Sequence, residues 1–213
     1  MRQDANAMQR DVKAAPDGQR RANVSRKTKE TDIRVTLDLD GTGAVDVETG
    51  VPFFDHMLNA FGRHGLFDLT VRAVGDISID AHHTVEDTGI VIGQAIAQAL
   101  GDKRGIVRFG DTTMVMDEAL VLAACDISGR GQLHGNIELP ALVLGTFDVS
   151  LAREFFIALA ANAGITLHVR KIAGENVHHI LEAEFKAAGR ALCQATRVNP
   201  RIAEQLPTTK GVL

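Results

Sequence analysis

Two short stretches of the chain repeat one pattern of chemistry-bearing residues: two adjacent histidines, two further residues, and then a glutamate. They occupy positions 82–86 and 178–182, and they contain four of the eight histidines. Asp80 precedes the first stretch and Asn176 the second, and both residue types are preferred helix N-caps. The amphipathic sequence after each cap predicts a helix, to about residue 100 in one case and residue 194 in the other.

Helix geometry determines what such a motif can bind. The first histidine and the glutamate are four positions apart and share one face, whereas the second histidine points about 100° away. The first histidine and the glutamate can therefore hold one metal ion, while the second histidine must reach another. The economical arrangement has two ions, each taking the His/Glu pair of one motif and the second histidine of the other. Solvated histidines at helix starts are the alternative, which two motifs in matching context disfavour.

Composition excludes several classes of function. The chain has 213 residues, 45% of them hydrophobic, and a net charge of −4, so it can bury a core, and its charge implies no nucleic-acid or membrane partner. No apolar run is long enough to span a membrane, and the polar start predicts a disordered tail over residues 1–22 rather than a signal peptide. Cys125 and Cys193 lie in apolar stretches and are expected to be buried thiols, which fits a reducing cytoplasm.

The remaining elements predict an internal duplication. Alternation and turn residues predict strands at 22–30, 33–39 and 44–48 (the last a return strand after the turn at 40–43), 66–74, 107–116 and 119–126, and a helix at 52–64. A shift of 98 residues places 56–58 on 154–156 and 69–71 on 167–169, so a helix, a strand and a metal-type helix occur twice. We therefore predict an α+β fold of duplicated β/α half-domains, at 23–115 and 116–213, each a β-sheet with helices on one face.

The duplication also proposes the missing metal ligands. His56 and Glu154 occupy equivalent positions and precede their motifs by similar distances. Two sets of four ligands result: His56, His83, His178 and Glu182 for ion one, and His82, Glu86, Glu154 and His179 for ion two. Nitrogen and carboxylate ligands without thiolates favour Mn²⁺, Fe²⁺, Co²⁺ or Zn²⁺ and leave open positions for a substrate.

From about Arg26 to Leu213 the sequence resembles the imidazoleglycerol-phosphate dehydratases. The resemblance is carried by six segments: 29–31 (Lys-Glu-Thr), 53–58 (Phe-Phe-Asp-His-Met-Leu), 80–87 (Asp-Ala-His-His-Thr-Val-Glu-Asp), 128–130 (Ser-Gly-Arg), 178–186 (His-His-Ile-Leu-Glu-Ala-Glu-Phe-Lys) and 209–213 (Thr-Lys-Gly-Val-Leu). It implies a fold like domain 2 of ribosomal protein S5 and an enzyme with two Mn²⁺ per subunit. It also implies a homo-oligomer of 24 subunits built from trimers, with the metal sites at subunit interfaces. The family often has histidine where this chain has Glu154.

The resemblance also implies a reaction and further site residues. The family converts D-erythro-imidazole glycerol phosphate into imidazole acetol phosphate and water in L-histidine biosynthesis, here by way of a metal-bound imidazolate. Catalytic roles would fall to Glu30, His82, Glu86, His178 and Glu182. Substrate contacts would come from Glu30, His64, Arg108, Arg130, Lys186, Thr208, Thr209 and Lys210, with the arginines and Lys210 holding the phosphate.

Two other classes of function remain open at this point. Another dinuclear metal enzyme, such as a phosphohydrolase, would use the same ligands but release inorganic phosphate. A non-catalytic metal-binding shell would need the two motifs but not Glu30, Arg108, Arg130 or Lys210. The simpler interpretation of each arginine is a surface salt bridge, and that of Lys186 a solvated helix lysine.

Overall fold

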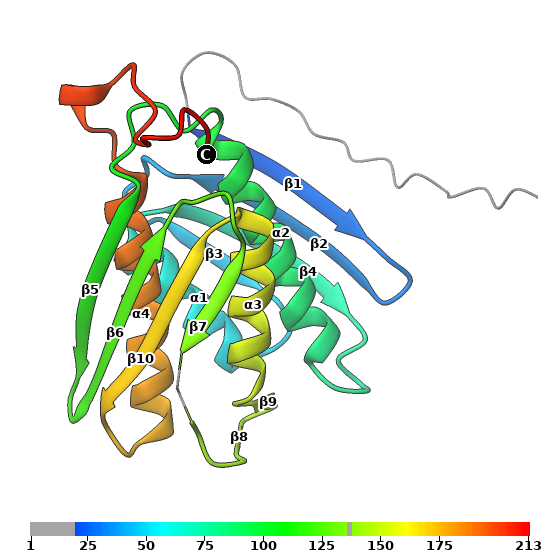
Figure 1. The fold of residues 1–213 in the computed structure, drawn as a ribbon. Coiled ribbons are helices and arrows are strands. Elements are labelled where there is room, and N and C mark those ends of the chain that lie inside the picture. The colour runs from blue at the N-terminus through cyan, green and yellow to red at the C-terminus, as the bar shows by residue number, and fades with distance from the viewer. Residues whose placement is uncertain (1–19, 136–137) are drawn as a thin grey trace, which may run out of the picture.

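The computed structural model describes residues 20–135 and 138–213 (Figure 1). The disordered tail predicted for residues 1–22 lies outside the described residues except for its last three. Of these, Arg21 and Ala22 already belong to the first strand. The predicted strand at 22–30 ends earlier than expected, at Lys27.

The first sheet has the order β1-β2-β4-β3. Its elements are β1 (Arg21–Lys27), β2 (Thr31–Asp38), β3 (Val45–Glu48), α1 (Pro52–Gly65), β4 (Asp68–Gly75) and α2 (His82–Leu100). β2 pairs antiparallel with both β1 and β4, whereas β3 pairs parallel with β4. The prediction that 44–48 returns along 33–39 was therefore wrong. The Asp68 carboxylate accepts the N–H groups of Thr42 and Ala44, at 2.8 and 2.9 Å, and so leads the chain past β2 to the far side of β4.

The second sheet repeats this plan with the order β5-β6-β10-β7. Its elements are β5 (Phe109–Met116), β6 (Ala119–Asp126), β7 (Gln132–Gly135), a small hairpin of β8 (Val143–Leu144) and β9 (Phe147–Asp148), α3 (Leu151–Ala163), β10 (Thr166–Ala173), α4 (Val177–Thr196) and the 3₁₀ turn η1 (Pro200–Ile202). Equivalent strands of the two halves begin 88 residues apart for β2 and β6, at Thr31 and Ala119, but 98 residues apart for β4 and β10, at Asp68 and Thr166. The difference arises because the second half contains the additional β8–β9 segment before α3.

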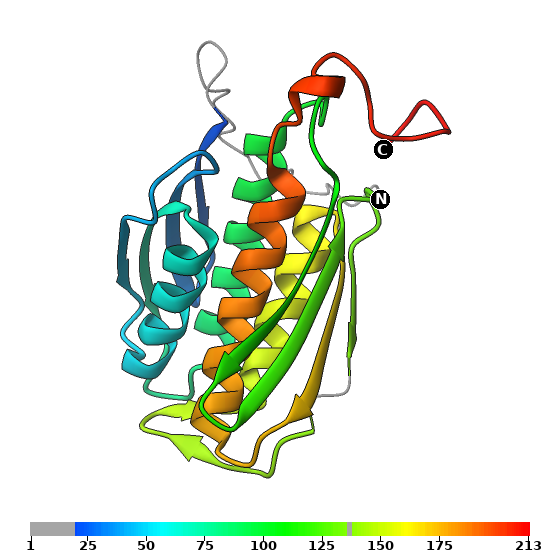
Figure 2. The same ribbon diagram turned by 90° about the vertical axis from the view of Figure 1, so that its left-hand side faces the viewer.

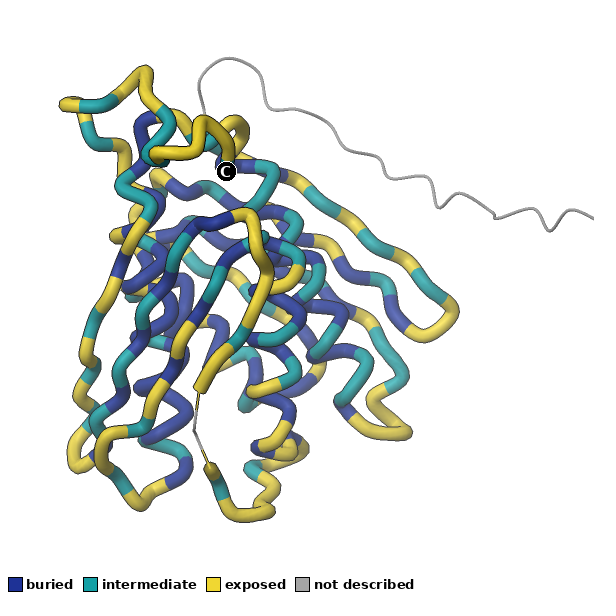
Figure 3. The backbone as a smooth tube through the Cα atoms, viewed as in Figure 1, coloured by how far each residue is buried: buried dark blue, intermediate teal, exposed yellow. Residues whose placement is uncertain are grey.

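The two sheets form the outside of the molecule and the helices lie between them (Figure 2). α2 packs on β1 and β2, and α4 packs on β5 and β6, while across the middle α2 packs against α3 and α1 against α4. Buried backbone concentrates along the facing sides of these elements (Figure 3). The duplicated α+β fold is thus confirmed, with one core shared by both halves. None of the helices that the structure describes is long and apolar enough to cross a membrane.

The predicted division at residue 115 falls inside the β5–β6 hairpin. β5 pairs with β6 over its whole length and belongs to the second sheet. The sheets therefore divide the chain between α2 and β5, at about 101–108. The alternating pattern of β5 alone could not reveal which half it joins, because strand pairing depends on long-range contacts.

Two glycines allow the helix pairs to pack at short distance. A Cβ on Gly93 of α2 would lie 2.6 Å from the Leu159 carbonyl oxygen of α3, and Gly189 of α4 lies directly against the Phe61 carbonyl of α1. These two contacts are equivalent in the duplicated fold, with offsets of 96 and 98 residues. Because the opposing atoms are backbone, neither contact can be relieved by a side-chain rotation.

We expect Gly93→Ala and Gly189→Ala each to lower the free energy of unfolding by about 1–3 kcal/mol, the usual cost of overpacking. This net loss would occur although alanine is the better helix former. Denaturant unfolding of the metal-free protein measures the effect. Arg190→Ala, next to Gly189 but exposed, is the matched control and should change stability by less than about 0.5 kcal/mol. Unchanged stability in both glycine variants would show that the helices can move apart freely.

Candidate metal centre and substrate site

Three of the predicted ligands of ion one meet between α1 and α4. The Glu182 Oε2 atom lies 3.3 Å from the Nε2 atom of His56 and 3.3 Å from that of His178. The ligand atoms of the three residues all lie within 4.8 Å of one another, the one such group of three in residues 20–135 and 138–213. Phe53 packs edge-on against the His178 ring and limits its movement. His56 comes from the first half of the chain, and His178 and Glu182 come from the second. We call this incomplete set of three ligands the half-site for ion one, because the predicted fourth ligand is absent from it.

The spacing of these atoms fits a metal ion. An ion bound at about 2.0–2.2 Å from nitrogen and oxygen ligands separates neighbouring ligand atoms by about 3 Å. The 3.3 Å distances agree with that requirement. Two imidazoles and a carboxylate suit a borderline or hard divalent cation.

Glu182 is buried yet remains ionised. Burial raises its pKa, but the Lys186 ammonium and the His56 imidazole outweigh burial and leave the pKa below its ordinary value. The Lys186 Nζ atom lies 2.6 Å from Glu182 Oε1, the oxygen not shared with the histidines. Lys186 is therefore not a solvated helix lysine, as the simpler interpretation held, because its side chain is only 14% exposed.

A cavity of about 460 Å³ opens beside this cluster. It is lined by His56, Glu182, Lys186 and His64, together with Arg63 and the segment 43–45. Burial and the neighbouring Lys186 lower the pKa of His64, so its imidazole is held neutral. Two residues expected to contact substrate, His64 and Lys186, thus lie at the mouth of the half-site for ion one.

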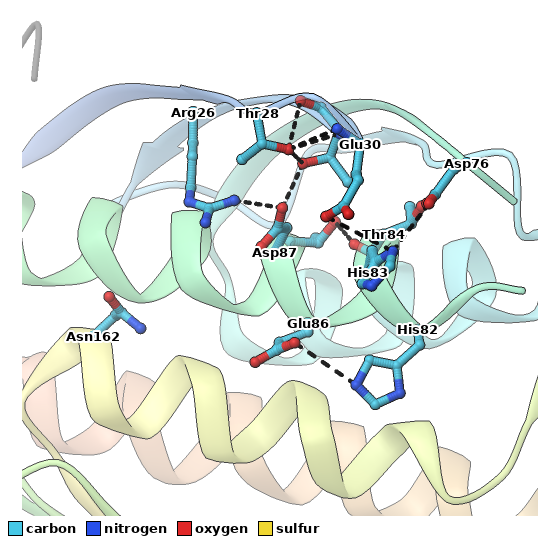
Figure 4. A network of polar contacts seen from close by, with 12 residues as sticks. Arg26, Thr28, Glu30, Asp76, His82, His83, Thr84, Glu86, Asp87 and Asn162 are labelled. Carbon is cyan, nitrogen blue, oxygen red and sulfur yellow. Dashed lines mark hydrogen bonds and ion pairs between the residues drawn. The ribbon is translucent and has the colours of Figure 1, made fainter. Parts of the chain in front are cut away.

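The half-site for ion two is the counterpart on α2. The His82 Nε2 atom lies 3.7 Å from Glu86 Oε2, and both side chains point to the α3 side of the helix (Figure 4). Glu154 lies in the first turn of α3, beside Phe155, whose carbonyl oxygen would lie 2.6 Å from a Cβ on Gly89. The ligand atoms of His82, Glu86 and Glu154 do not come together among the described residues as those of His56, His178 and Glu182 do, and the Glu154 carboxylate instead lies 3.8 Å from Arg153. For ion two the structure thus shows the pair of His82 and Glu86 but does not bring Glu154 to it.

The N-cap residue predicted from the sequence is the observed one in α4 but not in α2. The Asn176 side chain accepts hydrogen bonds from the backbone N–H groups of His178 and His179 and caps α4 as predicted. Ala81, not Asp80, occupies the N-cap of α2. The Asp80 carboxylate still accepts the N–H of His82 at 2.8 Å, so it fixes the motif from one residue further out.

The second histidines point away from the half-sites of their own chain. The His83 Nδ1 atom lies 3.0 Å from Asp76 Oδ2, and the His179 Nδ1 atom lies 2.7 Å from Glu118 Oε2. The divergence predicted for adjacent histidines is present, because His178 contacts Glu182 whereas its neighbour His179 contacts Glu118. Within one chain, neither second histidine joins the half-site of the other motif.

A buried ion pair holds Glu30 above His83. Asp87, the residue after Glu86, pairs with Arg26 of β1 and accepts a hydrogen bond from the Thr31 hydroxyl (Figure 4). This contact fastens the β1–β2 turn to the first turns of α2. Glu30, at the end of that turn, lies with its Oε2 atom 4.0 Å from His83 Nδ1.

The expected phosphate-binding groups lie at the opposite end of α4. The Arg108 guanidinium holds both Asp126 oxygens, at 2.7 and 3.1 Å, and donates to the Pro207 carbonyl, which anchors the C-terminal segment with Thr208, Thr209 and Lys210. Arg130 approaches the same aspartate at 3.9 Å and is 61% exposed.

A helix offset gives the separation of these groups from the metal half-site. The Arg108 N–H donates to the carbonyl of Ala195, thirteen residues after Glu182 on the same helix. At 1.5 Å of rise per residue, the backbone of Arg108 lies about 20 Å along α4 from Glu182. The arginine expected to bind phosphate and the cluster of His56, His178 and Glu182 therefore lie at opposite ends of this helix.

Sequence reasoning missed Asp76 and Glu118. Asp76 follows a strand and Glu118 lies in a hairpin turn, where an acidic residue is commonly solvated. A signal for Glu118 was available, because the 88-residue offset of the first strands makes it the counterpart of Glu30. Nothing in the local sequence distinguishes Asp76.

The fold and the site define a class: a duplicated α+β protein with a His/carboxylate half-site for a metal at each of two helix starts. Residues 49–192 match the family model described as imidazoleglycerol-phosphate dehydratase. The chain is 60% identical over 194 residues to imidazoleglycerol-phosphate dehydratase of Paracoccus denitrificans, covering 91% of this chain and all of the relative. It is 58% identical to that of Desulforamulus reducens, covering 91% and 98%.

Solved structures of the same family have a similar fold. The chain is similar to imidazoleglycerol-phosphate dehydratase of Staphylococcus aureus, with 39% identity, a TM-score of 0.75 and coverage of 83% and 98%. The enzyme of Pyrococcus furiosus, in complex with (S)-C348, gives 37% identity, a TM-score of 0.77 and coverage of 89% and 100%. The chain belongs to the imidazoleglycerol-phosphate dehydratase family, which confirms the resemblance found in its sequence. It is therefore a hydro-lyase of histidine biosynthesis, from a metal-dependent family that acts on a phosphorylated imidazole.

Proposed function

We propose that the chain dehydrates D-erythro-imidazole glycerol phosphate to imidazole acetol phosphate, using two Mn²⁺ per subunit. The cluster of His56, His178 and Glu182 is the observation that supports this most strongly, because its ligand atoms already have the spacing that an ion requires. Ion one would be held by these three residues and a His83, and ion two by His82, Glu86, Glu154 and a His179. When bound, the two ions would act as Lewis acids on the substrate ring and favour its imidazolate form, which promotes loss of the hydroxyl on the adjacent carbon.

The residues of the chain have separate tasks in this proposal. Lys186 balances the charge of Glu182, which keeps that carboxylate ionised in its buried position. Glu30 takes the proton from the carbon next to the one that loses the hydroxyl, and the resulting enol becomes the ketone. Its carboxylate suits that task because it is 58% exposed and lies within reach of the second histidine of α2. Arg108, Arg130 and Lys210 bind the phosphate through fixed positive charge.

Subunit contacts would complete the site. The second histidines and the C-terminal basic groups lie away from the half-sites of their own chain, so a neighbouring chain is the natural source of both. We propose a homo-oligomer in which each half-site receives its second histidine from another subunit, in a particle of 24 subunits built from trimers. Metal binding would then also stabilise the assembly by mass action.

One assay tests the function. Mn²⁺-loaded protein is mixed with imidazole glycerol phosphate, and the enolisable ketone and inorganic phosphate are both followed. We expect the ketone to form, and chelator to abolish its formation. Release of inorganic phosphate instead would favour a phosphohydrolase, and the absence of any reaction would favour a metal-binding shell.

We expect Arg130→Ala to raise KM about tenfold or more, since a charge-assisted contact is worth about 1.5–3 kcal/mol. Arg130 is a cleaner choice than Arg108 because it is exposed and does not anchor the C-terminal segment. Bound manganese and thermal stability should stay at wild-type values. Arg170→Ala, another exposed arginine of the second sheet, is the control. An unchanged KM in the Arg130 variant would show that Arg130 makes only a surface salt bridge and does not bind the phosphate.

A further inference from the structure

The second histidine of each motif is held at one ring nitrogen by an acid from another element. Asp76, directly after β4, contacts His83 Nδ1 at 3.0 Å, and Glu118, in the β5–β6 turn, contacts His179 Nδ1 at 2.7 Å. Both distances are those of a hydrogen bond from an imidazole N–H to a carboxylate. In both cases the other nitrogen, Nε2, makes no hydrogen bond among the described residues, although Asp117 Oδ2 lies 3.7 Å from His179 Nε2.

Glu118 is itself fixed in place. Its Oε1 atom accepts the backbone N–H of Asn176 at 2.9 Å, while its Oε2 atom holds His179. Asn176 in turn caps α4. Glu118 is therefore a fixed acceptor, attached to the helix start that carries the histidine.

Asp76 has the same relation to His83. Its Oδ2 atom takes the imidazole contact, and its Oδ1 atom is buried with no hydrogen-bond partner among residues 20–135 and 138–213. The side chain is only 20% exposed. A half-buried carboxylate with one side-chain partner is oriented by that partner, so the contact with His83 is its principal interaction.

Equivalent glutamates of the two halves make different contacts. Glu30 and Glu118 are equivalent, each ending the first turn of its half. Glu118 makes the hydrogen bond to the histidine of its half, whereas Glu30 stands 4.0 Å from His83, beyond hydrogen-bond distance. In the first half Asp76 makes that contact instead, and the Glu30 carboxylate makes no hydrogen bond with any described residue.

We propose that Asp76 and Glu118 are positioning residues for the metal ions, and that Asp76 thereby releases Glu30 to act on substrate. Each acid accepts the Nδ1–H of its histidine and fixes the tautomer in which Nε2 presents its lone pair to an ion. Carboxylates behind metal-bound histidines act in this way in other metal sites. This inference rests on the proposed function, because it assumes two ions per subunit.

The test measures Mn²⁺ affinity rather than activity. Metal-stripped full-length protein is dialysed against Mn²⁺, and bound ion is quantified by electron paramagnetic resonance. Asp76→Ala should weaken the ion that uses His83, and Glu118→Ala the ion that uses His179, each by about 10–100-fold. The His56→Ala and His82→Ala backgrounds, which retain ion two and ion one respectively, identify the ion affected.

Three controls separate positioning from folding. Asp76→Asn and Glu118→Gln keep an acceptor oxygen and should recover part of the affinity. Glu30→Gln and Glu175→Gln remove nearby charges without that hydrogen bond and should bind Mn²⁺ like wild type. Asn176→Ala loosens the start of α4, which carries His178 and Glu182 for ion one and His179 for ion two, so it should weaken both ions.

The outcomes are distinct. Selective loss of one ion in each alanine variant supports the proposal. Wild-type affinity in both variants, or weakening of both ions by Glu118→Ala as in Asn176→Ala, overturns it while leaving the proposed function intact. If the wild-type chain binds fewer than two ions, the proposed function fails and this inference fails with it.

Discussion

Two variants that are each inactive should recover activity when they assemble together. The first, His179→Ala with Glu182→Ala, loses ligands on α4 but keeps those on α2. The second, His83→Ala with Glu86→Ala, loses ligands on α2 but keeps those on α4. In a mixed oligomer, α4 of the second variant meets α2 of the first, and that interface has the full ligand set for both ions.

Equal co-expression should yield about a quarter of the wild-type activity and bound Mn²⁺, because about one interface in four of a symmetric oligomer pairs an intact α4 with an intact α2. Different affinity tags on the two chains allow purification of mixed particles. The geometry motivates the expectation, since His83 and His179 contact Asp76 and Glu118 rather than the half-sites of their own chain.

The control carries all four substitutions in one chain and is co-expressed with a differently tagged copy of itself. It should assemble without activity or bound metal. Mixed particles that form normally but bind no Mn²⁺ would show that the second histidines do not cross between subunits. The pairing of ligands proposed for the two ions would then be wrong.

The half-sites were predictable because they follow from local periodicity. Residues four apart on a helix share a face whatever surrounds them, so the contact of His178 with Glu182 required no knowledge of the fold. The contact of His56 with Glu182 came from the duplication, which matched α1 to α3 and so placed a ligand on each. Both inferences depended on spacing within the sequence alone.

The strand pairing, the acids behind the second histidines and the position of the arginines could not be predicted, because they depend on long-range contacts that residue spacing does not encode. The parallel pairing of β3 with β4 is set by Asp68, which binds the loop before β3 from a distant point in the sequence. Asp76 and Glu118 reach their histidines from separate elements. The separation of the arginines from the half-site became visible only when Arg108 was found beside Ala195, at the far end of α4.

Glu184 provides the second large effect, on stability rather than catalysis. It is 6% exposed on α4, two positions after Glu182 and thus about 200° away around the helix. It lies seven residues before Ala191, on the face that packs against Gly110 of β5. No described residue offers its carboxylate a hydrogen bond or an opposite charge. Burial raises its pKa from 4.5 to about 8.

The sign of the resulting pH dependence follows from proton uptake. Between pH 4.5 and pH 8 the folded chain keeps Glu184 protonated, whereas the unfolded chain releases the proton. Folding therefore binds a proton, and stability falls as pH rises through this window. Glu184→Gln cannot titrate. Its free energy of unfolding relative to wild type should rise between about pH 5 and pH 8, in total by roughly 3 kcal/mol, since one pKa unit corresponds to about 1.4 kcal/mol.

Denaturant unfolding in the presence of chelator, at half-unit steps of pH, measures this difference without any contribution from bound metal. Other titrating groups are common to both proteins and cancel in the comparison. Glu175→Gln, at an exposed position in the loop before α4, is the matched control and should give a profile parallel to wild type. If the Glu184→Gln profile also runs parallel to wild type, the carboxyl is solvated or paired in the folded protein, and the face of α4 against β5 is more open than its packing indicates.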